Sequence, residues 1–149
     1  MERFTWNGLK MKLKSLIKKY QTNNPFELAS LKKIHVFPWN LHNEIKGIYK
    51  YDKRNKYIFI NNNLDEAFQR FVCSHELGHA LLHPRSKTPF LREKTLFSLD
   101  KIEVEANTFA VELLLPDDQL YEYQNTNLSI YEICEMNGIP KGLSHLKIF

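Results

Sequence analysis

Hydrophobic residues recur at helical spacing at the start of the chain. Leucines follow one another every three or four positions from Leu9, and lysines fill most of the positions between them. This pattern predicts an amphipathic helix over about residues 7–20, with a solvated lysine-rich face. A second helix is expected to begin at Pro25, because proline favours the first helical position and Asn24 can act as the N-cap. Residues 1–32 are therefore predicted to form N-terminal helices.

The hydrophobic period changes over residues 33–61. Three short runs of β-branched and aromatic residues, KIHVFPW, IKGIYKY and KYIFIN, are separated by turn-forming segments. Because strands joined by short connections are usually antiparallel neighbours, we predict a small three-stranded antiparallel sheet.

Two strongly periodic segments follow the predicted sheet. The first, NLDEAFQRFVCSHELGHALLH at residues 63–83, is predicted to be a helix with a capping box between Asn63 and Glu66, and Pro84 ends it. The second, DKIEVEANTFAVELLL at residues 100–115, is predicted to be a helix that ends before a proline.

The last part of the chain, residues 117–149, is expected to form C-terminal helices. One of them has a capping box between Ser129 and Glu132 and stops at Gly138. Helices, then a sheet, then further helices indicate an α+β fold. The 149 residues are the length of one domain, so residues 1–149 are predicted to form a single α+β domain.

Composition narrows the class of protein but does not identify an activity. The chain is 43% hydrophobic and 26% charged, and its apolar runs are too short to span a membrane. The first residues also lack the apolar region of a signal peptide, so we expect a cytoplasmic protein without membrane contact. Residues 1–56 carry a net charge of +9 and residues 57–149 carry −5, which together give +4. We interpret this as a solvated lysine-rich face, and no direct nucleic-acid binding is expected.

The candidate chemistry lies in FVCSHELGHALLH, which contains the pattern His-Glu-x-x-His. His75 and His79 lie four residues apart, so on a helix their imidazoles share one face and can bind the same Zn²⁺. Glu76 projects beside the metal, where it can accept a proton from water that the metal acidifies. The alternative is a surface helix with solvated histidines. The predicted caps and the flanking apolar residues favour the zinc site.

A third metal ligand is needed, and His83 is the first candidate. His83 lies about 12 Å along the helix from His75, whereas two ligands of one tetrahedral zinc lie about 3.3–3.5 Å apart. We therefore favour an interaction of His83 with the C-terminal end of the helix dipole, and leave contact with a substrate open.

The other candidates are two carboxylates of the helix predicted at residues 100–115. Glu103 lies on a face of small and apolar residues that can pack closely on the motif helix, whereas Glu105 lies on a more mixed face. We therefore prefer Glu103. If Glu103 instead forms a capping box with Asp100, Glu105 becomes the candidate ligand. Asn107 is expected to orient Glu103 or His79.

Taken together, FVCSHELGHALLH and EVEANTFAVELLLP, preceded by NPFELA and YIFIN, resemble the ImmA/IrrE family of metallopeptidases. The resemblance implies a gluzincin-like zinc endopeptidase core. Its ligands are then the two motif histidines, His75 and His79, and the glutamate of an E-x-x-[A/C]-N pattern, which falls on Glu103. Glu76 is the implied catalytic base.

The resemblance also implies a biological role. Family members act as anti-repressors in bacteria, phages and mobile elements, so the expected substrate is a helix-turn-helix repressor. The alternative is a zinc-stabilised protein that inactivates a repressor by binding it, without cleavage. The run KYIFIN is expected to be an edge strand that pairs with the substrate. Candidates for stabilising the oxyanion are Tyr49, Tyr51, Tyr57, Tyr121, Tyr123 and His83, and the oligomeric state is left open.

Overall fold

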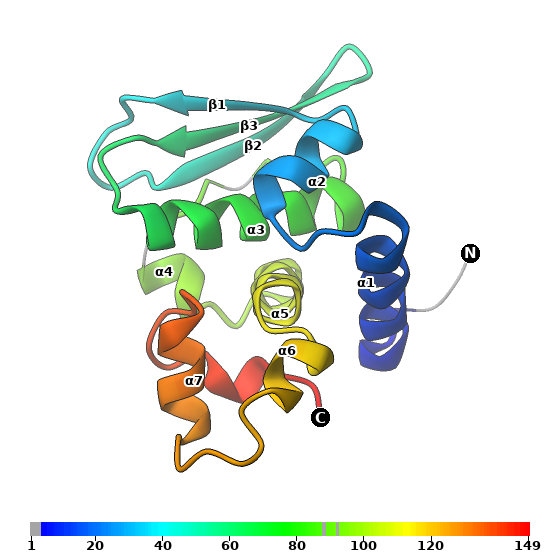
Figure 1. Cartoon of the computed structure of the whole chain (residues 1–149). Helices are drawn as coiled ribbons and strands as arrows, with labels where there is room; N and C mark the ends of the chain where they lie inside the picture. The colour runs from blue at the N-terminus through cyan, green and yellow to red at the C-terminus, as the bar shows by residue number, and fades with distance from the viewer. Residues whose placement is uncertain (1–3, 88, 92) are drawn as a thin grey trace.

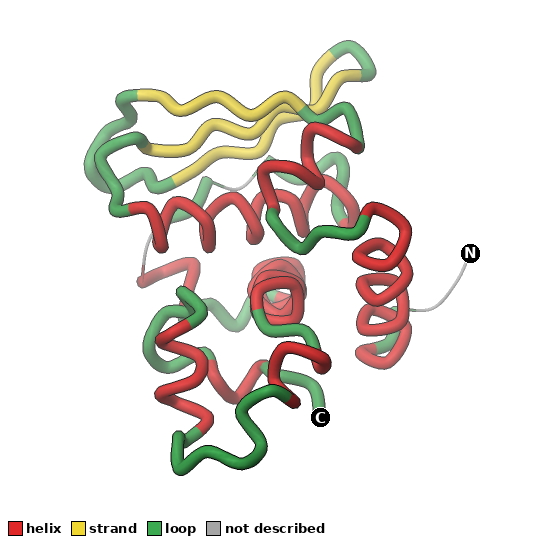
Figure 2. The backbone as a smooth tube through the Cα atoms, in the orientation of Figure 1, coloured by secondary structure: helices red, strands yellow, loops and turns green. Residues whose placement is uncertain are grey.

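The chain folds into a small sheet and a set of helices, and a computed structural model describes residues 4–87, 89–91 and 93–149. The sheet lies over one face of the long helix α3, and α5 crosses beneath the opposite face of α3 (Figure 1). Strands and helices thus form separate layers (Figure 2), and the predicted α+β class is confirmed. The elements are α1 (Trp6–Tyr20), α2 (Pro25–Leu31), β1 (His35–Trp39), β2 (Gly47–Asp52), β3 (Asn55–Asn61), α3 (Glu66–Leu82), α4 (Glu93–Leu96), α5 (Lys101–Leu114), α6 (Asp117–Tyr121), α7 (Ile130–Met136) and the 3₁₀ turn η1 (Ser144–Leu146).

The sheet is mixed, with the strand order β1-β3-β2. Strands β2 and β3 form an antiparallel hairpin, whose turn residues Lys53 and Arg54 both have positive φ angles. The prediction of an antiparallel sheet was wrong for β1, which pairs with β3 in parallel. The loop after Trp39 carries the chain past β3, and buried Asn61 holds this loop by donating to the carbonyls of residues 41, 42 and 45. The alternation of buried and exposed residues along a strand is the same in parallel and antiparallel pairs, so it does not specify the order of the strands in the sheet.

The start of α3 differs from the prediction by a few residues. Asp65 is the N-cap, and its side chain accepts a hydrogen bond from the backbone N–H of Phe68. The predicted capping box between Asn63 and Glu66 is therefore wrong, and the Asn63 amide instead donates to the side chain of Asn40. Both Asn63 and Asp65 have capping chemistry, so the sequence allowed either start.

The caps of the later helices bear on the functional site. Asp100 occupies the N-cap position of α5, but its side chain makes no capping hydrogen bond. The capping box between Asp100 and Glu103 does not form, which leaves the Glu103 carboxylate available for other contacts. In α7, the capping box between Ser129 and Glu132 is present as predicted.

Helices α3 and α5 form the buried centre of the protein. Every residue of α3 from 71 to 80 is buried, and most of α5 is buried as well. The two helices approach closely at Gly78, where an added Cβ would lie 3.1 Å from the Phe109 ring. The sheet covers the other side of α3 with side chains from its inner face, which include Tyr49, Ile58 and Ile60. Among the described residues, no helix has the length and apolar character that crossing a membrane requires.

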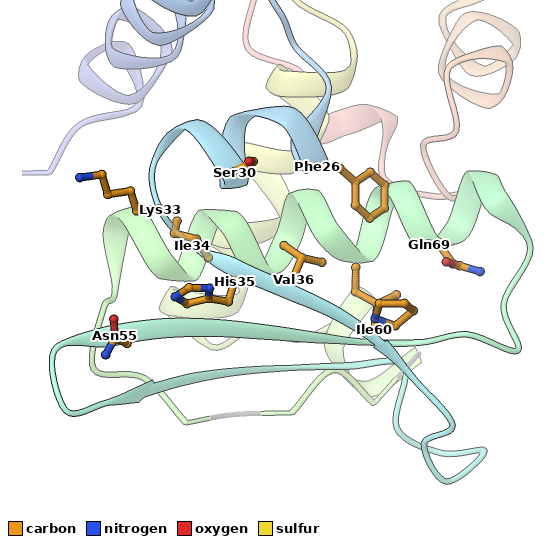
Figure 3. Close-up of a pocket in the computed structure, with 10 residues that line it drawn as sticks. Phe26, Ser30, Lys33, Ile34, His35, Val36, Asn55, Ile60 and Gln69 are labelled. Atoms are coloured by element: carbon orange, nitrogen blue, oxygen red, sulfur yellow. The ribbon is translucent and has the colours of Figure 1, made fainter.

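A groove of about 800 Å³ opens between α2 and the outer edge of β1 (Figure 3). Phe26 lines it from α2, and Val36 lines it from β1. Pro38 of β1 also lines it, and this residue has no N–H to offer to an added strand. The residues of the His-Glu-x-x-His pattern do not line this groove.

The C-terminal segment is tied to the helical core by a buried group of charges. The Lys147 side chain is fully buried, and its ammonium lies 2.7 Å from Glu112 of α5 and 2.8 Å from Asp117 of α6. Lys10 of α1 lies 3.0 Å from the same Asp117 carboxylate and donates to the backbone carbonyl of Ile148. Helix α1, the adjoining helices α5 and α6, and the C-terminal segment therefore meet around the carboxylates of Glu112 and Asp117.

Replacing Lys147 tests how much this group of charges stabilises the fold. Lys147→Met leaves the buried Glu112 carboxylate without its close cation, so the free energy of unfolding should fall by about 3–5 kcal/mol in urea denaturation. Lys14→Met removes an exposed ion pair to Asp117 and should cost less than about 1 kcal/mol. The double variant Glu112→Met/Lys147→Met should recover most of the loss, and equal effects of the two single lysine variants would contradict the assignment.

Candidate metal centre

Three side chains from α3 and α5 converge in the centre of the protein. His75 and His79 project from one face of α3, and their Nε2 atoms lie 3.1 Å apart. The Glu103 Oε1 atom of α5 lies 3.4 Å from the His75 Nε2 and 2.5 Å from the His79 Nε2. All three residues are buried, and each offers one atom that can bind a metal ion. The structure thus brings together the three residues predicted as ligands.

The ring orientation of His75 is fixed by Asn107 of α5. The Asn107 amide nitrogen donates to the carbonyls of Thr95 and Leu96, so its oxygen must face the His75 ring. That oxygen lies 2.8 Å from the His75 Nδ1, which therefore carries the proton. The Nε2 lone pair is left to face the centre. Asn107 was expected to orient Glu103 or His79, and the prediction was wrong about the partner, because the structure places the Asn107 oxygen against His75.

Burial and neighbouring charges shift the pKa values of the central residues. Burial lowers the pKa of His75, which favours the neutral imidazole that metal binding requires. Burial acts to raise the pKa of Glu103, but hydrogen bonds and charge from His75 and His79 outweigh it and lower that pKa to about 2. The centre therefore holds a carboxylate ion beside imidazole nitrogens.

Glu76 lies beside this group with both carboxylate oxygens buried. One of them is 3.8 Å from the His75 Nε2, and neither has a hydrogen-bond partner among the described residues. Burial and the nearby charge of Glu103 raise the pKa of Glu76 well above its ordinary value. A divalent cation at this point would compensate the charge of the two buried carboxylates and accept the converging nitrogen lone pairs. The residues present therefore fit a metal ion.

The two rejected ligand candidates, His83 and Glu105, contact each other. The His83 Nε2 lies 2.7 Å from the Glu105 Oε1, and the His83 Nδ1 lies 3.0 Å from the His79 Nδ1. Burial lowers the pKa of His83. Neither residue belongs to the group of three converging ligand atoms. We expected His83 to interact with the helix dipole and did not predict its contact with Glu105, because that contact depends on where α5 lies.

Two further contacts near the centre were not foreseen. Gly47 of β2 packs against α3, where an added Cβ would lie 2.5 Å from Val72 and 3.5 Å from the Cγ of Glu76. Phe90 is fully buried, with its ring centroid 4.7 Å from that of His75, and it forms a β-bridge with Gly47. A glycine within a predicted strand indicates a close approach of another element, so Gly47 could have predicted the contact of β2 with α3.

The expectation that KYIFIN is an edge strand was wrong. These residues belong to β3, which is the central strand and pairs on both sides. The edge strand beside the Glu76 region is β2. Of the tyrosines considered for the oxyanion, Tyr49 has its hydroxyl bonded to the carbonyl of Pro84, and Tyr57 stacks on His35. Burial raises the pKa of Tyr49 to about 12, with added effects from Tyr51 and Glu76.

Comparison with known proteins identifies the family of this chain. The profile of the IrrE N-terminal-like domain, Peptidase_M78, matches residues 29–143. The chain is 36% identical to Metallopeptidase ImmA of Bacillus subtilis (strain 168) over 119 residues, which cover 80% of this chain and 70% of that protein. It is also 64% identical over 139 residues to Uncharacterized immunity region protein 2 of Bacillus phage phi105, which cover 93% of this chain and 88% of that protein.

This chain belongs to the ImmA/IrrE family, within the Peptidase_M78 metallopeptidases. The family resemblance stated from the two motif segments is therefore confirmed.

Exchanging each of the two neighbouring glutamates for glutamine tests which one binds the metal. Glu103→Gln should weaken zinc binding by more than about 100-fold, because it removes a metal ligand. Replacing a residue that only supports a ligand typically weakens metal binding by about 10–100-fold, so the loss of a ligand should exceed that range. Glu105→Gln should weaken zinc binding by about 10-fold at most, since its carboxylate faces His83 and not the centre. Both affinities can be measured by competition with a fluorescent zinc chelator, and the reverse order would overturn the ligand set.

Proposed function

We propose that this protein is a zinc-dependent endopeptidase of the gluzincin type. The observation that carries the proposal is the convergence of His75, His79 and Glu103 around one point. The Glu76 carboxylate lies beside it without a hydrogen-bond partner among the described residues. Two histidines and a glutamate form a ligand set of catalytic zinc sites that leaves one coordination position free. The mixture of imidazole and carboxylate ligands favours zinc over magnesium or calcium, which prefer oxygen ligands.

In this proposal, each residue of the centre has a defined task. His75, His79 and Glu103 would hold the ion, and a bound ion would supply Lewis-acid polarisation of the scissile carbonyl group and a lowered pKa of water. Glu76 takes a proton from the attacking water and transfers it to the nitrogen of the leaving amine. Its raised pKa suits this exchange near neutral pH, because a base must also release the proton that it has taken. Asn107 keeps the His75 ring in place through the hydrogen bond to Nδ1.

The substrate is proposed to bind along β2. This strand is an edge of the sheet, and beyond the bridge at Gly47 its residues have no further strand as a partner among the described residues. A groove of about 640 Å³ lies along the rest of β2, and Arg85, Ser86 and Lys87 line its other side. An extended polypeptide can add to such an edge through main-chain hydrogen bonds. Tyr49 lines the same groove, but its single O–H already donates to the Pro84 carbonyl, so it could act as a donor to the oxyanion only by releasing that carbonyl.

The biological substrate is proposed to be a helix-turn-helix repressor, so that the enzyme acts as an anti-repressor in a phage or mobile element. A relative whose printed name places it in a phage immunity region, and a second named a metallopeptidase, support this role. The alternative function is inactivation of the repressor by binding alone. The buried Glu76 favours catalysis, because an unpaired buried carboxylate is costly and binding alone has no need of it.

Incubating the protein and Zn²⁺ with the repressor encoded beside it tests the proposal. Wild type should cleave the repressor into fragments that mass spectrometry can locate. Glu76→Gln should reduce the rate by about 10²–10⁴-fold, since it removes the proton acceptor but leaves the metal ligands.

Two controls separate catalysis from binding. A chelator should stop cleavage by wild type, and added Zn²⁺ should restore it. If Glu76→Gln releases the repressor from its operator as well as wild type does, with the repressor intact, the binding alternative replaces the enzyme.

A further inference from the structure

We infer that His83 and Glu105 act as a positioning pair that fixes the ring of His79 for metal binding. The inference rests on the proposed metal site, since it concerns how one of its ligands is held. It gives a function to the two residues that were considered as ligands and that the geometry places outside the ligand set.

The pair connects the ring of His79 to a carboxylate through an unbroken line of contacts. The His79 Nδ1 lies 3.0 Å from the His83 Nδ1, and the His83 Nε2 lies 2.7 Å from the Glu105 Oε1. Both distances are within the range of hydrogen bonds. The side chains of His83 and Glu105 are 12% and 6% exposed, so bulk water has little access to compete for these bonds.

The carboxylate determines the direction of every hydrogen bond in this line. An ionised carboxylate only accepts, so the His83 Nε2 must carry a proton and donate it to Glu105. In a neutral imidazole the other nitrogen is then an acceptor, and the His83 Nδ1 receives the N–H of the His79 Nδ1. The His79 Nε2 is left with a lone pair that faces Glu103 and His75. Glu105 thus selects the tautomer of His79 that can bind a metal.

Asn107 fixes the corresponding tautomer of His75 directly, because its amide oxygen accepts the N–H of the His75 Nδ1. Both motif histidines therefore present Nε2 to the centre, because a partner occupies Nδ1 in each case. Helix α5 supplies both carboxylates that act on His79, since Glu103 contacts its Nε2 side and Glu105 controls its Nδ1 side through His83. Two residues of separation along α5 place these carboxylates on the two sides of one ring.

A purely structural function would not require a carboxylate at position 105. Glu105 is 5% exposed, and its Oε2 has no hydrogen-bond partner among the described residues. A buried carboxylate with an unsatisfied oxygen is costly, and an apolar residue of similar size would pack without this cost. Its bond to His83 is the contact that offsets the cost.

The test combines zinc affinity with nuclear magnetic resonance of the histidine rings, using four variants. His83→Phe and Glu105→Leu break the line, and the zinc dissociation constant of each should rise by about 10–100-fold. Glu105→Gln keeps an oxygen that can accept from His83 but adds an amide that can donate to it, so its zinc dissociation constant should rise, by less than that of Glu105→Leu. His145→Phe replaces an exposed histidine outside the line and serves as the matched control.

The ring measurement is independent of both metal and activity. In wild type, the proton on the His79 Nδ1 should be visible with and without zinc, whereas in His83→Phe and Glu105→Leu it should exchange rapidly with water. If these two variants bind zinc within about twofold of wild type and keep that proton, the positioning pair is overturned while the peptidase remains. If wild type fails to bind zinc, the proposed function fails, and the ring protons of the metal-free protein still decide the positioning of His79.

Discussion

The packing of α5 against α3 is the contact on which the rest of the structure depends. It buries three glutamates, Glu76, Glu103 and Glu105, among histidines in the middle of a small protein. Buried carboxylates are tolerated when they meet hydrogen-bond donors or cations, and His79 of α3 and its C-cap residue His83 meet two of the three. Close approach of the helices at Gly78 makes these contacts possible. The same contact therefore determines both the interior of the fold and the candidate metal centre.

The parts of the structure that could be predicted are those encoded by local patterns. Helical periodicity and a proline located α3 and α5, and helix geometry excluded His83 as a ligand in favour of a carboxylate on another helix. The contacts that escaped prediction depend on the position of one element relative to another. Strand order is one example, because the alternation along β1 fits a parallel or an antiparallel neighbour equally well. The pairing of His83 with Glu105 is another, since spacing within α3 says nothing about the approach of α5.

The centre and the chain terminus are stabilised in different ways. Around the centre, imidazole nitrogens and the buried Glu76 and Glu103 carboxylates leave an electrostatic balance that a cation would complete. At the terminus, Lys147 supplies the cation from the protein itself, between Glu112 and Asp117. Helix α5 takes part in both, with Glu103 near its start and Glu112 near its end. Membership of a metallopeptidase family agrees with a centre in which no protein cation compensates the buried carboxylates among the described residues.

The bridge between Phe90 and Gly47 has a consequence for how the β2 edge can be used. The backbone N–H of Phe90 bonds to the Gly47 carbonyl, and its own carbonyl accepts from Lys46. The main-chain groups at the start of β2 are therefore already occupied. If a polypeptide adds to β2 as proposed, it can pair only with the residues after Gly47, so the Phe90 bridge would limit its register relative to Glu76.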